Sequence, residues 1–107
     1  SFGGQKHHLY DGSTWVQQYT RSEAHLITNE VLIAYESGRI ARYDETPRRI
    51  LPEQLRSAPL GSIIAVTPDD ALMPVLDAEL NRGSLRLLQQ FEADRGADLL
   101  ILEKELN

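Results

Sequence analysis

The stretch HLITNEVLIAYESGRIARY, residues 25–43, constrains the fold of this chain more than any other segment. Its two ends are short and β-prone, while its centre is a continuous apolar run whose periodicity fits either a helix or a strand. A helix is favoured because Asn29 precedes the run as an N-cap and Gly38 follows it as a stop. We therefore expect parallel strands over 25–28 and 39–43, joined by a helix over 30–37.

The segment Ile63–Val66 predicts a further buried strand, because four β-prone apolar residues follow a glycine and a serine. Thr67 then resembles a helix N-cap, with Pro68 at the first helical position and Asp70 three residues after the threonine. Asp69 and Asp70 complement the positive end of a helix dipole, and as a pair they also suit Mg²⁺. The capping role explains both aspartates and is the preferred interpretation.

Three helices are expected outside these segments. Trp15, Val16 and Tyr19 form one apolar stripe of a helix over 13–19 that is capped by residues 11–13. Trp15 is interpreted as a core residue, with sugar stacking as the alternative. The other two helices are expected over 53–57, with Pro52 in the first turn, and over 71–81, where Pro74 either kinks the helix or marks its true start.

The last part of the chain, residues 84–107, has two interpretations. Residues 84–92 fit both helical and strand spacing, whereas Leu99–Leu102 is a clear strand. An antiparallel hairpin of 85–92 with 98–104 is favoured over a helix followed by a strand, because Asp94-Arg95-Gly96 supplies a turn with a glycine for positive φ.

Together these elements predict one α/β domain over residues 9–107, preceded by a flexible lead-in over residues 1–8. The expected architecture is a three-layer sandwich with a short, Rossmann-like, mostly parallel sheet. About three strands are parallel, because strands joined through helices follow right-handed crossovers, and the C-terminal hairpin extends the sheet with antiparallel strands.

Composition and motifs argue against several functions. The net charge of −5 disfavours binding to nucleic acid, and the absence of cysteine excludes thiolate chemistry. The chain has no phosphate-binding loop, no dinucleotide-binding glycine pattern and no nucleophile elbow. The adjacent His7 and His8 are interpreted as solvated, since they project in different directions. No catalytic residue, cofactor or metal is therefore expected.

One candidate site is a crevice for a ligand or a partner beyond the carboxyl ends of the parallel strands, where doubly wound sheets bind ligands. The alternative is that the same polar residues cap helices, and this alternative is preferred. The candidate residues are Thr28, Asn29, Glu30, Tyr43, Asp44, Thr67, Asp69 and Asp70.

The order of several short motifs supports a resemblance. Trp15-Val16, the strand end Leu26–Asn29, Ala34-Tyr35 and the helix stop Ser37–Arg39 occur in that order, followed by the segment from Gly83 to Leu102. This order resembles the soluble C-terminal domain of polytopic bacterial glycosyltransferases of the dolichyl-phosphate-mannose and aminoarabinose transferase type.

The resemblance implies a non-catalytic accessory domain on the periplasmic or extracytoplasmic face of the inner membrane, which covers the active site or engages the acceptor. It implies an enzyme that uses a polyprenyl-phosphate-linked sugar donor, with membrane helices N-terminal to Ser1. The partners would be the membrane-embedded portion of the same polypeptide and a lipid-linked sugar or glycan acceptor. The acidic catalytic residues of such enzymes lie between membrane helices, so none is assigned here. The alternative function is a free-standing cytosolic α/β interaction or small-ligand-binding module.

Overall fold

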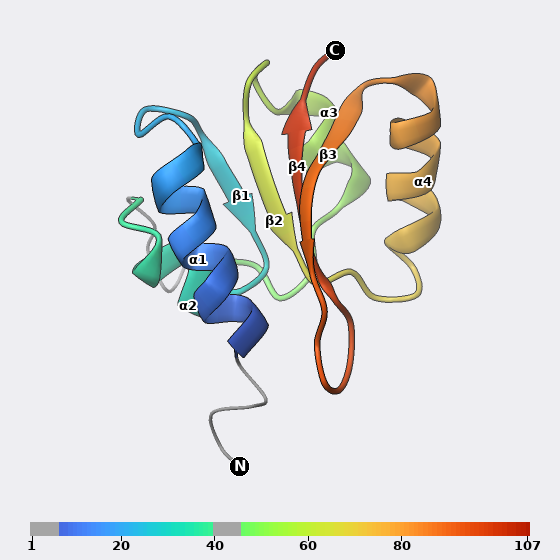
Figure 1. Cartoon of the computed structure of the whole chain (residues 1–107). Coiled ribbons are helices and arrows are strands. Elements are labelled where there is room, and N and C mark those ends of the chain that lie inside the picture. The colour runs from blue at the N-terminus through green and yellow to red at the C-terminus, as the bar shows by residue number, and fades with distance from the viewer. Residues whose placement is uncertain (1–6, 40–45) are drawn as a thin grey trace.

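The computed structural model describes residues 7–39 and 46–107 of the chain. The described strands form one mixed sheet in the order β1-β2-β4-β3, with helices on both of its faces (Figure 1). The Cα radius of gyration is 12.8 Å, close to the value of about 13 Å that is typical of a compact domain of this length. The elements are α1 (His7–Tyr19), β1 (Leu26–Thr28), α2 (Val31–Glu36), α3 (Pro52–Ser57), β2 (Ile63–Val66), α4 (Met73–Arg82), β3 (Leu85–Phe91) and β4 (Leu99–Lys104).

The sheet contains one parallel pair, β1 with β2, in which Leu26 lies opposite Ile63. β2 and β4 are antiparallel, as are β3 and β4. The predicted C-terminal hairpin is therefore confirmed, and its second strand lies next to β2. The prediction of a mostly parallel sheet is not confirmed, because the described strands include a single parallel pair. Arg39 is not in a strand, and residues 40–43 of the predicted second strand lie outside the described residues.

The two central strands are apolar on both faces. Alternate residues of a strand point to opposite sides of the sheet, so each continuous apolar run supplies two separate cores. The first core cluster receives Ile64 and Val66 from β2 with Leu100 and Leu102 from β4, while the second receives Ile63, Ala65, Leu99 and Ile101. This double burial explains why both strands are continuous apolar runs in the sequence.

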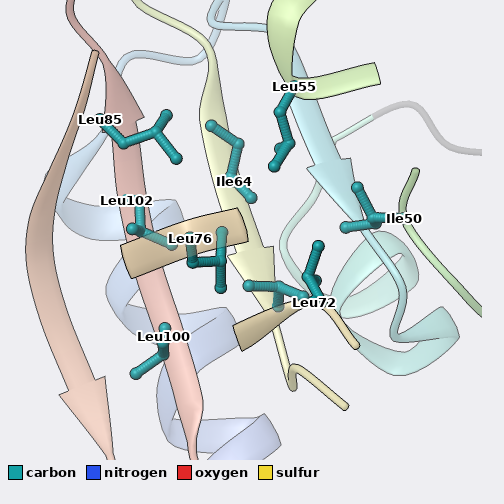
Figure 2. Packing of buried hydrophobic residues seen from close by; sticks show 9 residues of the cluster. Ile50, Leu55, Ile64, Leu72, Leu76, Leu85, Leu100 and Leu102 are labelled. Carbon is teal, nitrogen blue, oxygen red and sulfur yellow. The ribbon is translucent and has the colours of Figure 1, made fainter. Parts of the chain in front are cut away.

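The first core cluster lies between the sheet and helices α3 and α4. Figure 2 shows Leu55 of α3 and Leu76 of α4 pointing toward Ile64 and Leu102 of the sheet. Ile50, which precedes α3, closes one side of the cluster and is 2% exposed. The predicted helix over 53–57 is confirmed, with Pro52 in its first turn.

The second core cluster lies under α1 and α2. Leu9 and Val16 of α1 and Ile33 of α2 pack against Leu99 and the other residues of this sheet face. α1 approaches the sheet closely at Gly12, where a Cβ atom would lie 2.1 Å from Cδ2 of Leu99. A glycine inside the helix therefore permits this close packing, despite its low helix propensity.

α1 begins at His7, six residues before the predicted start at Ser13. Ser13 is buried inside the helix, and its hydroxyl donates a hydrogen bond of 2.8 Å to the carbonyl oxygen of Leu9. The prediction of a cap at residues 11–13 was therefore wrong, because this serine bonds back along the helix instead of capping it. The prediction that His7 and His8 are both solvated was also wrong, since His8 is buried.

α4 begins at Met73, and Pro74 lies in its first turn. Of the two predicted interpretations of Pro74, a shifted helix start is therefore correct. The helix ends at Gly83, whose φ of 83° lies in the left-handed region and whose N–H donates to the carbonyl oxygens of Glu79 and Leu80. Within residues 7–39 and 46–107, no helix is long and apolar enough to cross a bilayer.

Candidate functional site

The carboxyl ends of β1 and β2 lie side by side because these strands are parallel neighbours. Thr28 is the last residue of β1, Asn29 and Glu30 follow it, and Thr67 follows β2, so the structure brings these four predicted residues together. We call them the Asn29 cluster. In Figure 1 the cluster lies at the lower end of the sheet, toward which both arrowheads point.

The side-chain amide of Asn29 bonds the backbone of Thr67 on the neighbouring strand. Nδ2 of Asn29 donates to the carbonyl oxygen of Thr67 at 3.1 Å, and Oδ1 accepts from the backbone N–H of Thr67 at 3.0 Å. Asn29 thus offers one donor and one acceptor, as the backbone of a strand residue would. Its side chain extends the pairing of β1 with β2 to Thr67, the residue that follows β2.

The prediction that Asn29 caps α2 was therefore wrong. Glu30 occupies the N-cap position, and its side chain makes no capping hydrogen bond. The backbone N–H of Glu30 instead donates to Oγ1 of Thr28 at 3.0 Å, and Oε1 of Glu30 accepts from Oγ1 of Thr67 at 2.7 Å. The side chains of the Asn29 cluster are bonded to one another and to the backbone, which identifies the cluster as a structural crosslink between β1, α2 and the end of β2.

Asp69 and Asp70 do not cap a helix that starts at Thr67, since α4 starts six residues later. Oδ1 of Asp69 accepts from the backbone N–H of Leu72 at 2.8 Å and stabilises the turn that leads into α4. Its Oδ2 lies 3.4 Å from Nε of Arg49, in an exposed ion pair. Asp70 is exposed, and no group of three potential metal ligands occurs among the described residues. Tyr43 and Asp44 lie outside the described residues.

Arg39 links α1 to the segment after α2. Its guanidinium donates to the backbone carbonyl of Arg21 and to Oγ1 of Thr20, and its Nη2 lies 3.4 Å from the carbonyl oxygen of Val16. Val16 lies in the last turn of α1, and Thr20 and Arg21 directly follow the helix. Arg39 therefore stabilises the C-terminal end of α1.

Two ionisable residues, Lys104 and His8, are buried; the sequence did not single out Lys104 and predicted a solvated His8. Lys104 is 2% exposed and continues the row of Leu100 and Leu102 on the face of α3. Its Nζ donates to the carbonyl of Leu55 and, at 3.0 Å, to that of Arg56. A cation at the C-terminal end of α3 complements the helix dipole and bonds carbonyl groups that lack helical partners.

His8 lies near the hairpin between β3 and β4. Its Nδ1 is buried and makes no hydrogen bond among the described residues. The carboxylate of Asp98 accepts from the backbone N–H of Ala93 at 3.0 Å and from the side chain of Gln90 at 2.9 Å. The bond from Ala93 is the main cause that lowers the pKa of Asp98, followed by the bond from Gln90 and the charge of His8.

An aromatic pocket of about 230 Å³ opens beside α1, lined by Trp15, Tyr19, Arg21, Leu88, Arg86 and Glu103, among others. We call it the Trp15 pocket. The expected apolar stripe of this helix is only partly buried. Val16 is fully buried and Trp15 packs against the second core cluster, whereas Tyr19 is 68% exposed.

A second hollow, of about 690 Å³, lies between α3 and α4 and is lined mainly by Pro52, Arg56, Pro74, Val75 and Ala78. Neither hollow includes a residue of the Asn29 cluster. Comparisons with protein-family models, with curated proteins and with solved structures found no match to this chain.

Proposed function

We propose that this chain is a non-catalytic extracytoplasmic accessory domain of a membrane-bound glycosyltransferase that uses a polyprenyl-phosphate-linked sugar donor. The domain covers the active site of the enzyme or engages the acceptor, and its constant partner is the membrane-embedded portion of the same polypeptide. The observation that carries the proposal is the order of motifs from Trp15-Val16 through Thr28-Asn29 to Ser37–Arg39.

In the structure those motifs share a role, because each holds parts of the fold together. Asn29 joins β1 to the end of β2, and Arg39 joins the segment after α2 to the end of α1. Val16 is fully buried between α1 and the sheet. Motifs that stabilise a fold indicate which type of domain a chain forms, and they do not indicate a reaction. The proposed domain has a three-layer, Rossmann-like arrangement, and the helices on both faces of the sheet support it.

The nucleotide sequence upstream of Ser1 in the parent gene tests the proposal. The expected result is about ten or more apolar spans of about 20 residues each, which is the length that crosses a bilayer as a helix. A parent protein without such spans would overturn the proposal. A reporter that is active only outside the cytoplasm, fused after Asn107, should be active on the same account.

A further inference from the structure

The Trp15 pocket lies at the end of the sheet opposite to the Asn29 cluster. It is bounded by the last turns of α1 and by Ile63, the first residue of β2, and it continues over Leu88 of β3. In Figure 1 this position corresponds to the upper end of the sheet, where α1 leads into β1. The pocket is therefore formed by residues 15–24 together with strand residues far away in the sequence.

One wall of the pocket is aromatic. Trp15 and Tyr19 are one helical turn apart, with ring centroids 5.3 Å from each other and an angle of 36° between the ring planes. The core holds Trp15 in place, and Tyr19 extends the aromatic surface into solvent. Rigid aromatic rings provide a large contact area at a small cost in conformational entropy, and they keep a polar tip for hydrogen bonding.

Another part of the lining is polar, since it includes Arg86 and Glu103. Nη2 of Arg86 donates to Oε1 of Glu103 at 2.9 Å, and Nε of Arg86 bonds Glu105. The second carboxylate oxygen of Glu103 makes no hydrogen bond within residues 7–39 and 46–107, so it can accept one from a ligand. The two carboxylates also raise the pKa of Arg86, chiefly through the hydrogen bond to Glu105.

Arg21 supplies a second group for hydrogen bonds at the mouth of the pocket. Its Nε lies 3.7 Å from Glu23, and both side chains are more than two thirds exposed, so this ion pair is weak. Nη2 of Arg21 would lie 3.4 Å from a Cβ atom at Gly61. Gly61 has a φ of 83°, a conformation that favours glycine, and the Arg21 guanidinium lies beside it at the pocket.

The geometry points to a binding site for a single neutral sugar ring, with the apolar C–H face of the ring on Trp15 and Tyr19 and its hydroxyl groups at Arg21 and Glu103. Pockets for drug-sized ligands hold about 300–1,000 Å³, and the volume of about 230 Å³ here suits one ring. This inference rests on the proposed function, since it assigns the place where the domain engages a glycan acceptor.

The charges around the pocket favour a neutral ligand over a phosphate. Three cations, Arg21, Arg39 and Arg86, lie around the pocket together with the three carboxylates of Glu23, Glu103 and Glu105, so these charges balance. Arg86 is already bonded to two of those carboxylates, so it has little attraction left for an anion. A sugar hydroxyl, in contrast, can donate to Glu103 and accept from Arg21 at the same time.

Titration of the 107-residue chain with methyl pyranosides of glucose, mannose and galactose tests this site. Trp15 is the only tryptophan, so its fluorescence and its indole N–H resonance report on the pocket directly. For ligands of this size we expect a Kd on the order of millimolar for at least one sugar. Tyr19→Ala and Arg21→Ala should each weaken binding about tenfold or more, because each removes one ligand contact.

Tyr10→Ala is the matched control, because Tyr10 is a half-exposed aromatic residue on the same helix that does not line the pocket. It should leave the Kd unchanged, and circular dichroism should show that all three variants are folded. A response to adenosine, uridine or inorganic phosphate without any response to the sugars would overturn the inference. Sugar-induced shifts remote from Trp15, or a complete lack of response up to 100 mM, on the order of a hundred times the expected Kd, would also overturn it.

The two proposals fail separately. If membrane spans occur upstream of Ser1 but the chain binds no sugar, the proposed function stands and the sugar site is wrong. Binding of sugar at Trp15 in a parent protein without membrane spans would keep the site and remove the proposed function.

Discussion

The side-chain amide of Asn29 forms two hydrogen bonds with the backbone of Thr67, which is 38 residues away in the sequence. These bonds satisfy a backbone N–H and a carbonyl group just beyond the end of β2, after the pairing of β1 with β2 has ended. Asn29 precedes a helix in the sequence, but its side chain bonds the Thr67 backbone as a neighbouring strand would. Because Asn29 joins the ends of the two parallel strands, its substitution should affect stability.

Asn29→Ala should lower the free energy of unfolding by about 1–3 kcal/mol, since it leaves partly buried backbone groups of Thr67 without partners. Asn29→Asp should cost more, because a carboxylate cannot donate to the carbonyl of Thr67 and repels Glu30. Urea unfolding at pH 7 measures both effects. Asn81→Ala, at an exposed position of α4, is the control and should change stability by no more than about 0.5 kcal/mol. Equal effects of Asn29→Ala and Asn81→Ala would contradict the role of this amide.

Lys104 should stabilise the protein through α3. Lys104→Met keeps the length of the side chain but removes the charged donor from the carbonyls of Leu55 and Arg56. Hydrogen bonds to charged groups contribute about 1.5–3 kcal/mol, partly offset by the cost of burying the ammonium group, so we expect a loss of about 1–3 kcal/mol.

Thermal unfolding provides the measurement for Lys104→Met, with Arg95→Met as the control. Arg95 is exposed in the hairpin turn, so the same loss of a cation there should have almost no effect on stability. A Lys104→Met variant as stable as the Arg95→Met variant would show that the buried ammonium contributes nothing to α3.

Gly12→Ala tests the close contact between α1 and β4. The added methyl group meets Leu99, which is fully buried, and overpacking of a core costs about 1–3 kcal/mol. The higher helix propensity of alanine returns up to about 1 kcal/mol, so a net loss of stability is expected. Leu99→Val in the same chain should recover part of the loss, with a coupling of about 0.5–3 kcal/mol in the double-mutant cycle. A gain of stability in Gly12→Ala alone would mean that Leu99 moves aside without cost.

The stability of the β3–β4 hairpin at acid pH should depend on the ionisation of the Asp98 carboxyl group. Hydrogen bonds from Ala93 and Gln90 lower its pKa below the ordinary value of 3.8. A carboxylate with a lowered pKa adds stability above pH 3.8, and this stability is lost as the pH falls through the lower pKa of the folded state. NMR titration of the Asp98 carboxyl group should therefore give a pKa below 3.8, and Gln90→Ala should raise it. A pKa of 3.8 or higher in the native chain would contradict the hydrogen bonds seen here.

Local pattern was sufficient to predict the central strands and the hairpin. The apolar runs that form β2 and β4 are buried on both faces, and Gly96 adopts the positive φ that its place in the turn requires. The sequence left the start of α4 between two alternatives because two sets of start signals, at Thr67 and at Pro74, compete. Leu72 is buried in the first core cluster, so the residues up to Leu72 form a turn that precedes α4. This burial depends on tertiary packing, which overrides local helix propensity.

The candidate site was harder to predict because its contacts are distant in sequence. The pairing of Asn29 with Thr67 depends on the register of β1 and β2, and the pairing of Arg86 with Glu103 depends on the register of the hairpin. A single sequence does not display either register. Trp15 was considered as a sugar-stacking residue from its type alone, but the residues that complete its pocket come from β2, β3 and β4.

The central claim is that the polar residues of the Asn29 cluster join the ends of β1 and β2 and so hold the fold together. Hydrogen exchange of the Thr67 backbone N–H tests it most directly, since the side chain of Asn29 is its acceptor. We predict that this amide is protected in the native chain and loses its protection in Asn29→Ala, while the amide of Ile101 in β4 stays protected in both. Exchange of the Thr67 amide at the rate of an unprotected N–H in the native chain would contradict the claim.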